Sequence, residues 1–84
     1  MTDGAERDLL FEQFASLKLL GEQRYDDMYE ARDQHDVDSC YRDAKDAFDD
    51  AIELAGRLGL VEEALALSER LGHIKQVYRS QFAG

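Results

Sequence analysis

The chain has 84 residues, so it is predicted to form a single domain over residues 1–84, and its 44% hydrophobic content argues against disorder. Its net charge of −9 comes from residues 1–56, where sixteen acids face six bases; nucleic acid and anionic membranes are therefore excluded as expected partners, because phosphate binding needs clustered Lys and Arg. Cys40 is the only cysteine, which excludes an intrachain disulfide and favours a cytoplasmic location.

Apolar residues recur every three or four positions through the first third of the chain, which predicts a first helix over about residues 5–34. The positions expected to face the core are Leu10, Phe14, Leu17, Gly21, Tyr25 and Met28. The pattern runs through Gly21 without a change of phase. We therefore expect one continuous helix in which this glycine allows a close contact or a bend, and a break into two helices at Gly21 is the alternative.

The first half of this helix carries more apolar side chains than one helical face holds. They are Leu9, Leu10, Phe11, Phe14, Leu17, Leu19 and Leu20. A surface helix needs a single apolar stripe. Either both other helices pack against this segment, or part of it forms an interface. We favour the interface and predict a homodimer, with a seam made by Leu10, Phe11, Phe14 and Leu17.

The stretch HDVDS, residues 35–39, is the clearest interruption of the helical pattern, because Asp36, Asp38 and Ser39 are all favourable N-cap residues. It predicts that a second helix covers about residues 39–57. The positions of this helix expected to face the core are Tyr41, Ala44, Phe48, Ala51, Ala55 and Leu58.

The stretch GRLGL, residues 56–60, predicts that the second helix ends in a left-handed glycine cap. A third helix is then expected over about residues 61–81. Its core-facing positions are Ala64, Leu67, Leu71, Ile74 and Tyr78. The predicted fold class is all-α, with three antiparallel helices joined by short turns.

The second helix contains a small-large-small pattern of Ala44, Phe48 and Ala51, preceded by Tyr41 and followed by Ile52 and Leu54. This pattern resembles the second half of a tetratricopeptide repeat, and the pair Leu71-Gly72 stands where the next repeat has its Leu-Gly pair. The resemblance covers about residues 25–82, which is one repeat and a following helix. Other family positions differ here, where the chain has Met28, Ala31, Arg32, His35 and Gly56.

The resemblance implies a protein-binding function in which the first helix of the repeat lines a groove. The positions that would face this groove are Asp26, Tyr29 and Asp33, with Asp36 at its end. A groove with these acids would suit a basic peptide or protein rich in Lys and Arg. The alternative is that the same acids form only a solvated helix face.

Four residues with metal-ligating side chains lie close together in the sequence: His35, Asp36, Asp38 and Cys40. The series lacks the glycine turn and the closing glutamate of a calcium loop. A Cys40–His35 dyad would need the chain to fold the two side chains together, and the neighbouring acids would raise the pKa of the thiol. We therefore expect a capped turn here, with no metal, no cofactor and no catalysis.

The sequence thus predicts a small acidic protein-interaction module that is not an enzyme. Its expected partner is a second copy or another protein, such as a basic peptide. One alternative is a small metal- or ligand-sensing regulator that uses the turn at residues 35–40. Another is a structural subunit that stacks on a larger helical complex, and fold likeness alone does not choose between them.

Overall fold

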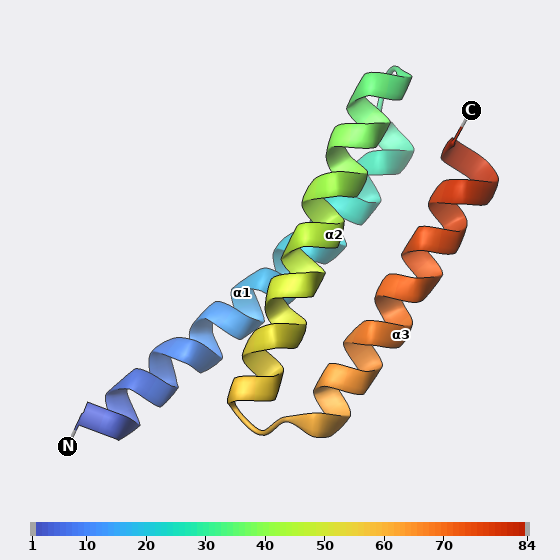
Figure 1. Ribbon diagram of the computed structural model, residues 1–84. Coiled ribbons are helices and arrows are strands. Elements are labelled where there is room, and N and C mark those ends of the chain that lie inside the picture. Colours follow the sequence, from blue (N-terminus) through green and yellow to red (C-terminus); the bar gives the residue numbers. More distant parts are fainter. Residues whose placement is uncertain (1, 84) are drawn as a thin grey trace.

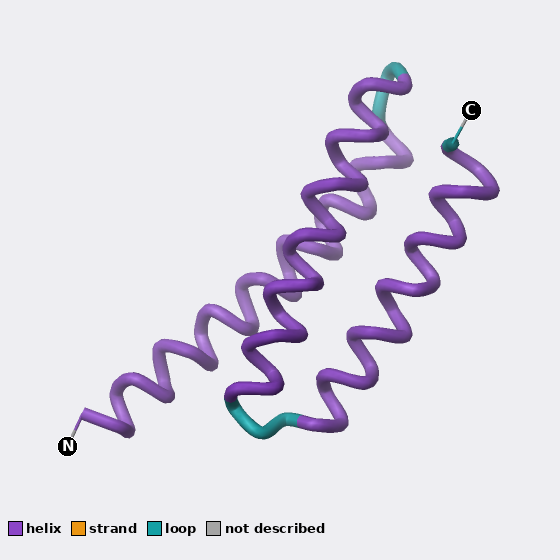
Figure 2. Tube along the Cα trace, viewed as in Figure 1, coloured by secondary structure: helices purple, strands orange, loops and turns teal. Residues whose placement is uncertain are grey.

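The computed structural model describes residues 2–83, which form three consecutive helices (Figures 1 and 2). Helix α1 covers Thr2–Glu30, α2 covers Gln34–Arg57, and α3 covers Val61–Val77 and continues into one π-helical turn, η1, at Tyr78–Phe82. Each helix runs antiparallel to the one before it, and short turns join them (Figure 1). The predicted all-α, three-helix fold class is confirmed.

The three helices form a thin, elongated body. Its Cα atoms extend over 51 × 20 × 13 Å, and its radius of gyration is 14.3 Å, whereas a compact chain of this length has a value of about 12 Å. Figure 1 shows α1 crossing behind α2 at an angle, so that its N-terminal turns project to one side. A body this thin covers α1 on one side only, which leaves much of that helix facing solvent.

The core lies along α2, which packs against both α1 and α3. Its largest fully buried side chains are Met28, Phe48 and Ile74, one from each helix. Every position that the sequence predicted to face the core is buried or half-buried. The core-facing positions predicted for the three helices are therefore confirmed.

The Phe48 ring of α2 packs closely against α1 at Gly21. A Cβ atom built on Gly21 would lie 2.8 Å from Cε2 of Phe48, whose ring is fully buried. The helix is continuous through this glycine, as predicted, and a break there is excluded. Because Gly21 has no side chain, the Phe48 ring can pack directly against the backbone of α1.

The turn between α1 and α2 lies earlier than the sequence predicted. Asp33 is the N-cap of α2, with extended backbone angles, and its side chain accepts a hydrogen bond of 2.8 Å from the Asp36 amide. The predicted interruption at residues 35–39 is therefore wrong, because these residues form the first turns of α2. The predicted limits of the first helix, 5 and 34, are corrected to 2 and 30.

The turn between α2 and α3 has the predicted glycine cap. Gly59 has a φ of 76°, a left-handed conformation that residues with a Cβ rarely adopt. The amide of Leu60 donates to the carbonyl of Ala55 at 2.8 Å, and that of Gly59 to Gly56 at 3.2 Å, which is the Schellman arrangement. The Arg7 guanidinium donates to the Leu58 carbonyl at 3.0 Å and so ties the start of α1 to this turn.

Replacing Gly21 by alanine is expected to destabilise the fold by about 1–3 kcal/mol, because the new methyl group would displace the Phe48 ring from a fully packed core. Urea unfolding measures this change. Gly72→Ala is the matched control: Gly72 is also helical, and no atom lies within 4 Å of its added Cβ. That variant is expected to gain about 0.5–1 kcal/mol from helix propensity. Equal effects at both glycines would contradict the close contact.

Candidate functional site

The predicted dimer seam is largely used inside the chain itself. Phe14 is buried in the core, with 6% of its surface exposed. Leu10 and Leu17 pack against that core and are half-buried. Of the four predicted residues only Phe11 is exposed, and the Arg7 guanidinium lies 5.4 Å from its ring centroid. The structure therefore leaves Phe11 as the exposed member of the predicted seam, and a homodimer through these four residues stays a prediction.

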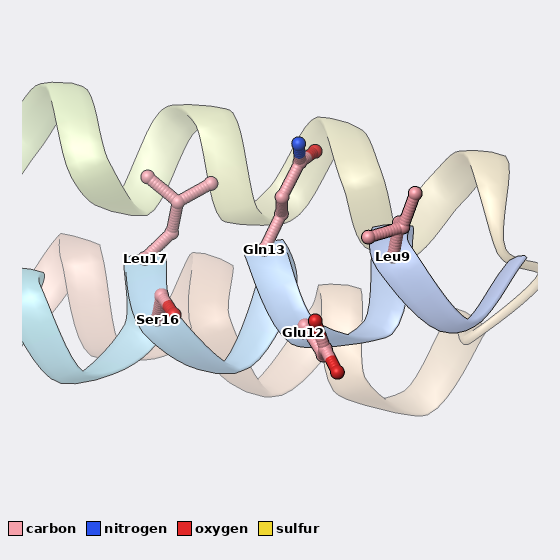
Figure 3. A pocket seen from close by; sticks show the side chains of 5 residues that line it. All are labelled: Leu9, Glu12, Gln13, Ser16 and Leu17. Atoms are coloured by element: carbon pink, nitrogen blue, oxygen red, sulfur yellow. The ribbon is translucent and has the colours of Figure 1, made fainter. Parts of the chain in front are cut away.

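A different row of α1 side chains faces solvent. Leu9 is 59% exposed and Leu20 is 40% exposed, and Leu17 lies between them on the same side of the helix. The side chains of Leu9, Gln13 and Leu17 point the same way in Figure 3, on the side where α2 lies. A shallow hollow of about 440 Å³ follows this row. It is lined by Leu9, Glu12, Gln13, Ser16 and Leu17.

A second hollow of about 240 Å³ continues the first, because both contain Leu17. Its lining comes from two helices: Leu17, Leu20 and Arg24 of α1, and Asp43, Asp46, Ala47 and Asp50 of α2. We name the two hollows together the outer groove. Its floor is the leucine row of α1, and one of its walls is a line of α2 aspartates.

The charge of the outer groove is negative. Arg24 is the one base in its lining, and it lies 3.3 Å from Asp27 and 3.7 Å from Asp43. Within residues 2–83, no cationic group lies at ion-pair distance from Asp46, Asp50 or Glu12. The groove therefore combines exposed leucines with three carboxylates that have no cation beside them.

The four residues predicted to bind a partner are all exposed, and two of them also build the start of α2. Asp33 is the cap of α2, and Asp36 donates its backbone amide to that cap. Tyr29 is 54% exposed, but its hydroxyl lies 3.1 Å from the hydroxyl of Tyr25. Its ring also packs edge-on against the Phe82 ring, with 5.1 Å between the two ring centroids. Only Asp26 is an exposed acid without a described contact.

The side of α1 that faces α3 is held by internal contacts. Arg70 donates two hydrogen bonds to the Glu22 carboxylate, at 2.8 and 2.7 Å, and its guanidinium lies 5.0 Å from the Tyr25 ring centroid. The hydrogen bond from Arg70 lowers the pKa of Glu22. Burial and the hydrogen bond with Tyr29 raise the pKa of Tyr25 to about 12. This side of α1 therefore holds the helices together and leaves little room for a partner.

The residues of the predicted turn at 35–40 are spread around the first turns of α2. Within residues 2–83, no group of three or more His, Cys, Asp or Glu side chains is placed to hold a metal ion. The Tyr78 hydroxyl donates to Asp38 at 2.6 Å, which lowers the pKa of that carboxyl. Burial raises the pKa of the Cys40 thiol, which keeps it protonated and weakly nucleophilic. The described side chains therefore give no support to a metal- or ligand-sensing turn, which stays an alternative prediction.

No helix within residues 2–83 has both the length and the apolar character needed to cross a bilayer. No protein-family model, curated protein or solved structure matches this chain. The tetratricopeptide resemblance therefore has no support from known proteins. Function has to be inferred from the groove itself.

The cap at Asp33 leads to a stability prediction. Replacing Asp33 by alanine is expected to cost about 1 kcal/mol of unfolding free energy, because the first amides of α2 lose their side-chain acceptor. Asp36→Ala should cost only a few tenths of a kcal/mol, the contribution of an acid to the helix dipole. Thermal or urea unfolding compares the two. The reverse order would place the cap within residues 35–39 and contradict the structure.

The Glu22–Arg70 pair leads to a prediction of pH dependence. Because the folded-state pKa of Glu22 is lowered, its stabilising contribution is complete above the ordinary glutamate pKa of 4.5 and is lost as pH falls through the lowered value. The difference in unfolding free energy between wild type and Glu22→Gln should therefore be constant from neutral pH to about 5 and shrink below that. Both side chains are partly exposed, so the difference should be about 1 kcal/mol at most.

The control for this titration is Glu69→Gln, the same change at an exposed position of α3. Its difference from wild type shows what the same chemical change does at a glutamate that has no ion-pair partner within residues 2–83. Parallel pH curves for the two variants would mean that the pair with Arg70 contributes nothing to stability.

Proposed function

We propose that this protein is a small helical docking module that binds a partner helix in the outer groove. The observation that carries the proposal is the leucine row Leu9, Leu17 and Leu20, which is partly exposed beside two connected hollows. Apolar side chains that are exposed beside a hollow and rimmed by polar residues are candidates for a protein interaction site. With Gln13 between Leu9 and Leu17, these side chains follow the intervals of three and four by which helices pack against one another.

The shape of the groove suits a helix more than a small molecule. Its two hollows lie end to end along α1 and are shallow, whereas small-molecule sites enclose most of their ligand. An amphipathic helix docks by placing residues i, i+3 or i+4, and i+7 in such an apolar groove. Covering the row would also supply the second face that a thin three-helix body lacks.

Other exposed apolar side chains support this role less well. Val61 and Leu65 of α3 are 67% and 61% exposed, but the hollow beside Val61 is formed mainly by the α2–α3 turn and by Glu62 and Glu63. The α3 pair therefore serves as a control surface.

The proposal is tested by selecting binders from a displayed library of helical peptides and by measuring the solution molar mass with light scattering. The strip variant, Leu9→Gln/Leu20→Gln, should keep the wild-type melting temperature within a few degrees, because both residues are exposed. Its affinity for the selected peptides should be at least tenfold lower than that of the wild type. If the wild type forms a dimer, the variant should be a monomer.

The matched control is Val61→Gln/Leu65→Gln, which removes two apolar side chains from α3 that are more exposed than Leu9 and Leu20. It should bind as wild type does. Binders that tolerate the strip variant and lose affinity in the α3 variant would place docking elsewhere and contradict the proposal. A wild type that stays monomeric and yields no binder would contradict it as well.

A further inference from the structure

We infer that the occupant of the outer groove is a basic amphipathic helix, one that sets leucine-like side chains on the α1 row and Lys or Arg side chains beside the α2 aspartates. This inference rests on the proposed function and specifies the chemistry of its partner. It follows from the juxtaposition of an apolar floor with an acidic wall.

The wall has a regular spacing. Asp43, Asp46 and Asp50 follow each other at intervals of three and four on α2, which puts their carboxylates on one face of that helix. Asp43 is already paired with Arg24. Asp46 and Asp50 are exposed, and no base within residues 2–83 pairs with them. Two carboxylates of the wall are thus available to cations from a partner.

The opposite edge of the floor repeats the same charge. Glu12 lines the first hollow, and its carboxylate points away from α2 in Figure 3. A helix lying on the leucine row would therefore meet Glu12 on one flank at the first hollow and the α2 aspartates on its other flank at the second hollow. Lys and Arg suit these flanking positions, because their long apolar stems cover leucine while their charged ends reach the carboxylates.

A second copy of this chain fits the groove poorly. In a symmetric dimer the same surface meets itself, so each groove would bring its acids toward those of the other copy. The two bases near the floor are already engaged: Arg7 with the Leu58 carbonyl, and Lys18 with Glu63 at 3.3 Å. Like charges facing each other across an interface are unfavourable, and each copy adds a net charge of −9.

The test uses two synthetic helical peptides of about five turns, roughly 18 residues, with the same leucine row. One carries Lys at the flanking positions and the other carries Glu. Binding to the full-length protein is measured by fluorescence anisotropy at low and high salt. At low salt the affinity of the Lys peptide is expected to be about ten times that of the Glu peptide, or higher. At high salt the ratio of the two affinities should fall, because salt screens the charges.

Two variants, each of which removes two negative charges, test whether the α2 aspartates cause the preference for the Lys peptide. Asp46→Asn/Asp50→Asn removes the unpaired acids of the wall, and should weaken the Lys peptide several-fold without changing the Glu peptide in the same direction. Asp26→Asn/Glu69→Gln removes two exposed acids outside the groove and should leave Lys-peptide affinity near that of wild type. Equal losses in both variants would mean general attraction to an acidic protein and would overturn the inference.

The remaining outcomes separate this inference from the proposed function. If both peptides bind equally and the strip variant abolishes both, the basic partner is wrong and the docking groove stands. The same conclusion follows if the wild type is a dimer that the strip variant dissociates, because the occupant is then a second copy. If neither peptide binds and the wild type is monomeric, both the inference and the docking function are overturned.

Discussion

The contact between Gly21 and the Phe48 ring is the constraint on which the rest of the structure depends. It lets α1 and α2 approach closely at their crossing, and the alanines on either side of Phe48, Ala44 and Ala51, are fully buried there. A contact between a ring and a bare backbone fixes both the axial register and the rotation of α1. Once that rotation is set, Leu10 and Phe14 turn toward the core and Leu17 lies half-buried at its edge. Leu9 and Leu20 are exposed, and Leu20 lies beside the aspartates of α2. The outer groove is therefore a consequence of the same packing that stabilises the fold.

The sequence predicted the features that depend on helical periodicity and on glycine. The three core-facing lines, the continuity of α1 and the cap at Gly59 all follow from spacing or from backbone conformation, which are local properties. The start of α2 was placed about five residues late because HDVDS contains three good N-cap residues, whereas Asp33 is equally suited. Val37 carried the decisive signal: it is buried and keeps the same helical phase as Tyr41, Ala44 and Phe48, so the helix had to begin before it.

The candidate site was harder to predict because it depends on tertiary packing. The excess of apolar residues in the first half of α1 was visible in the sequence, but their division between core and solvent was not. It depends on where α3 lies and on contacts such as those of Arg7 with the Leu58 carbonyl and of Lys18 with Glu63. The acidic wall combines α2 residues with a floor some thirty positions earlier, and no local pattern links the two. Conversely, the residues at 35–40 are neighbours in sequence but a helix spreads them apart, since adjacent positions point about 100° away from each other.

The outer groove carries two separate energetic costs, and one occupant would relieve both. Exposed leucines leave apolar surface in water, at roughly 25 cal/mol per Å² relative to burial. Asp43, Asp46 and Asp50 repel one another at the i, i+3 and i+4 spacings, where like charges destabilise a helix by a few tenths of a kcal/mol per pair. Within residues 2–83, Asp43 is the one acid of the three that has a base at ion-pair distance, and that base is Arg24. Between α1 and α3, by comparison, Glu22 has Arg70, and the rings of Tyr25 and Tyr29 pack against each other. Because both costs fall on the surface of the outer groove, a ligand that supplies apolar contact and positive charge together would relieve both at once.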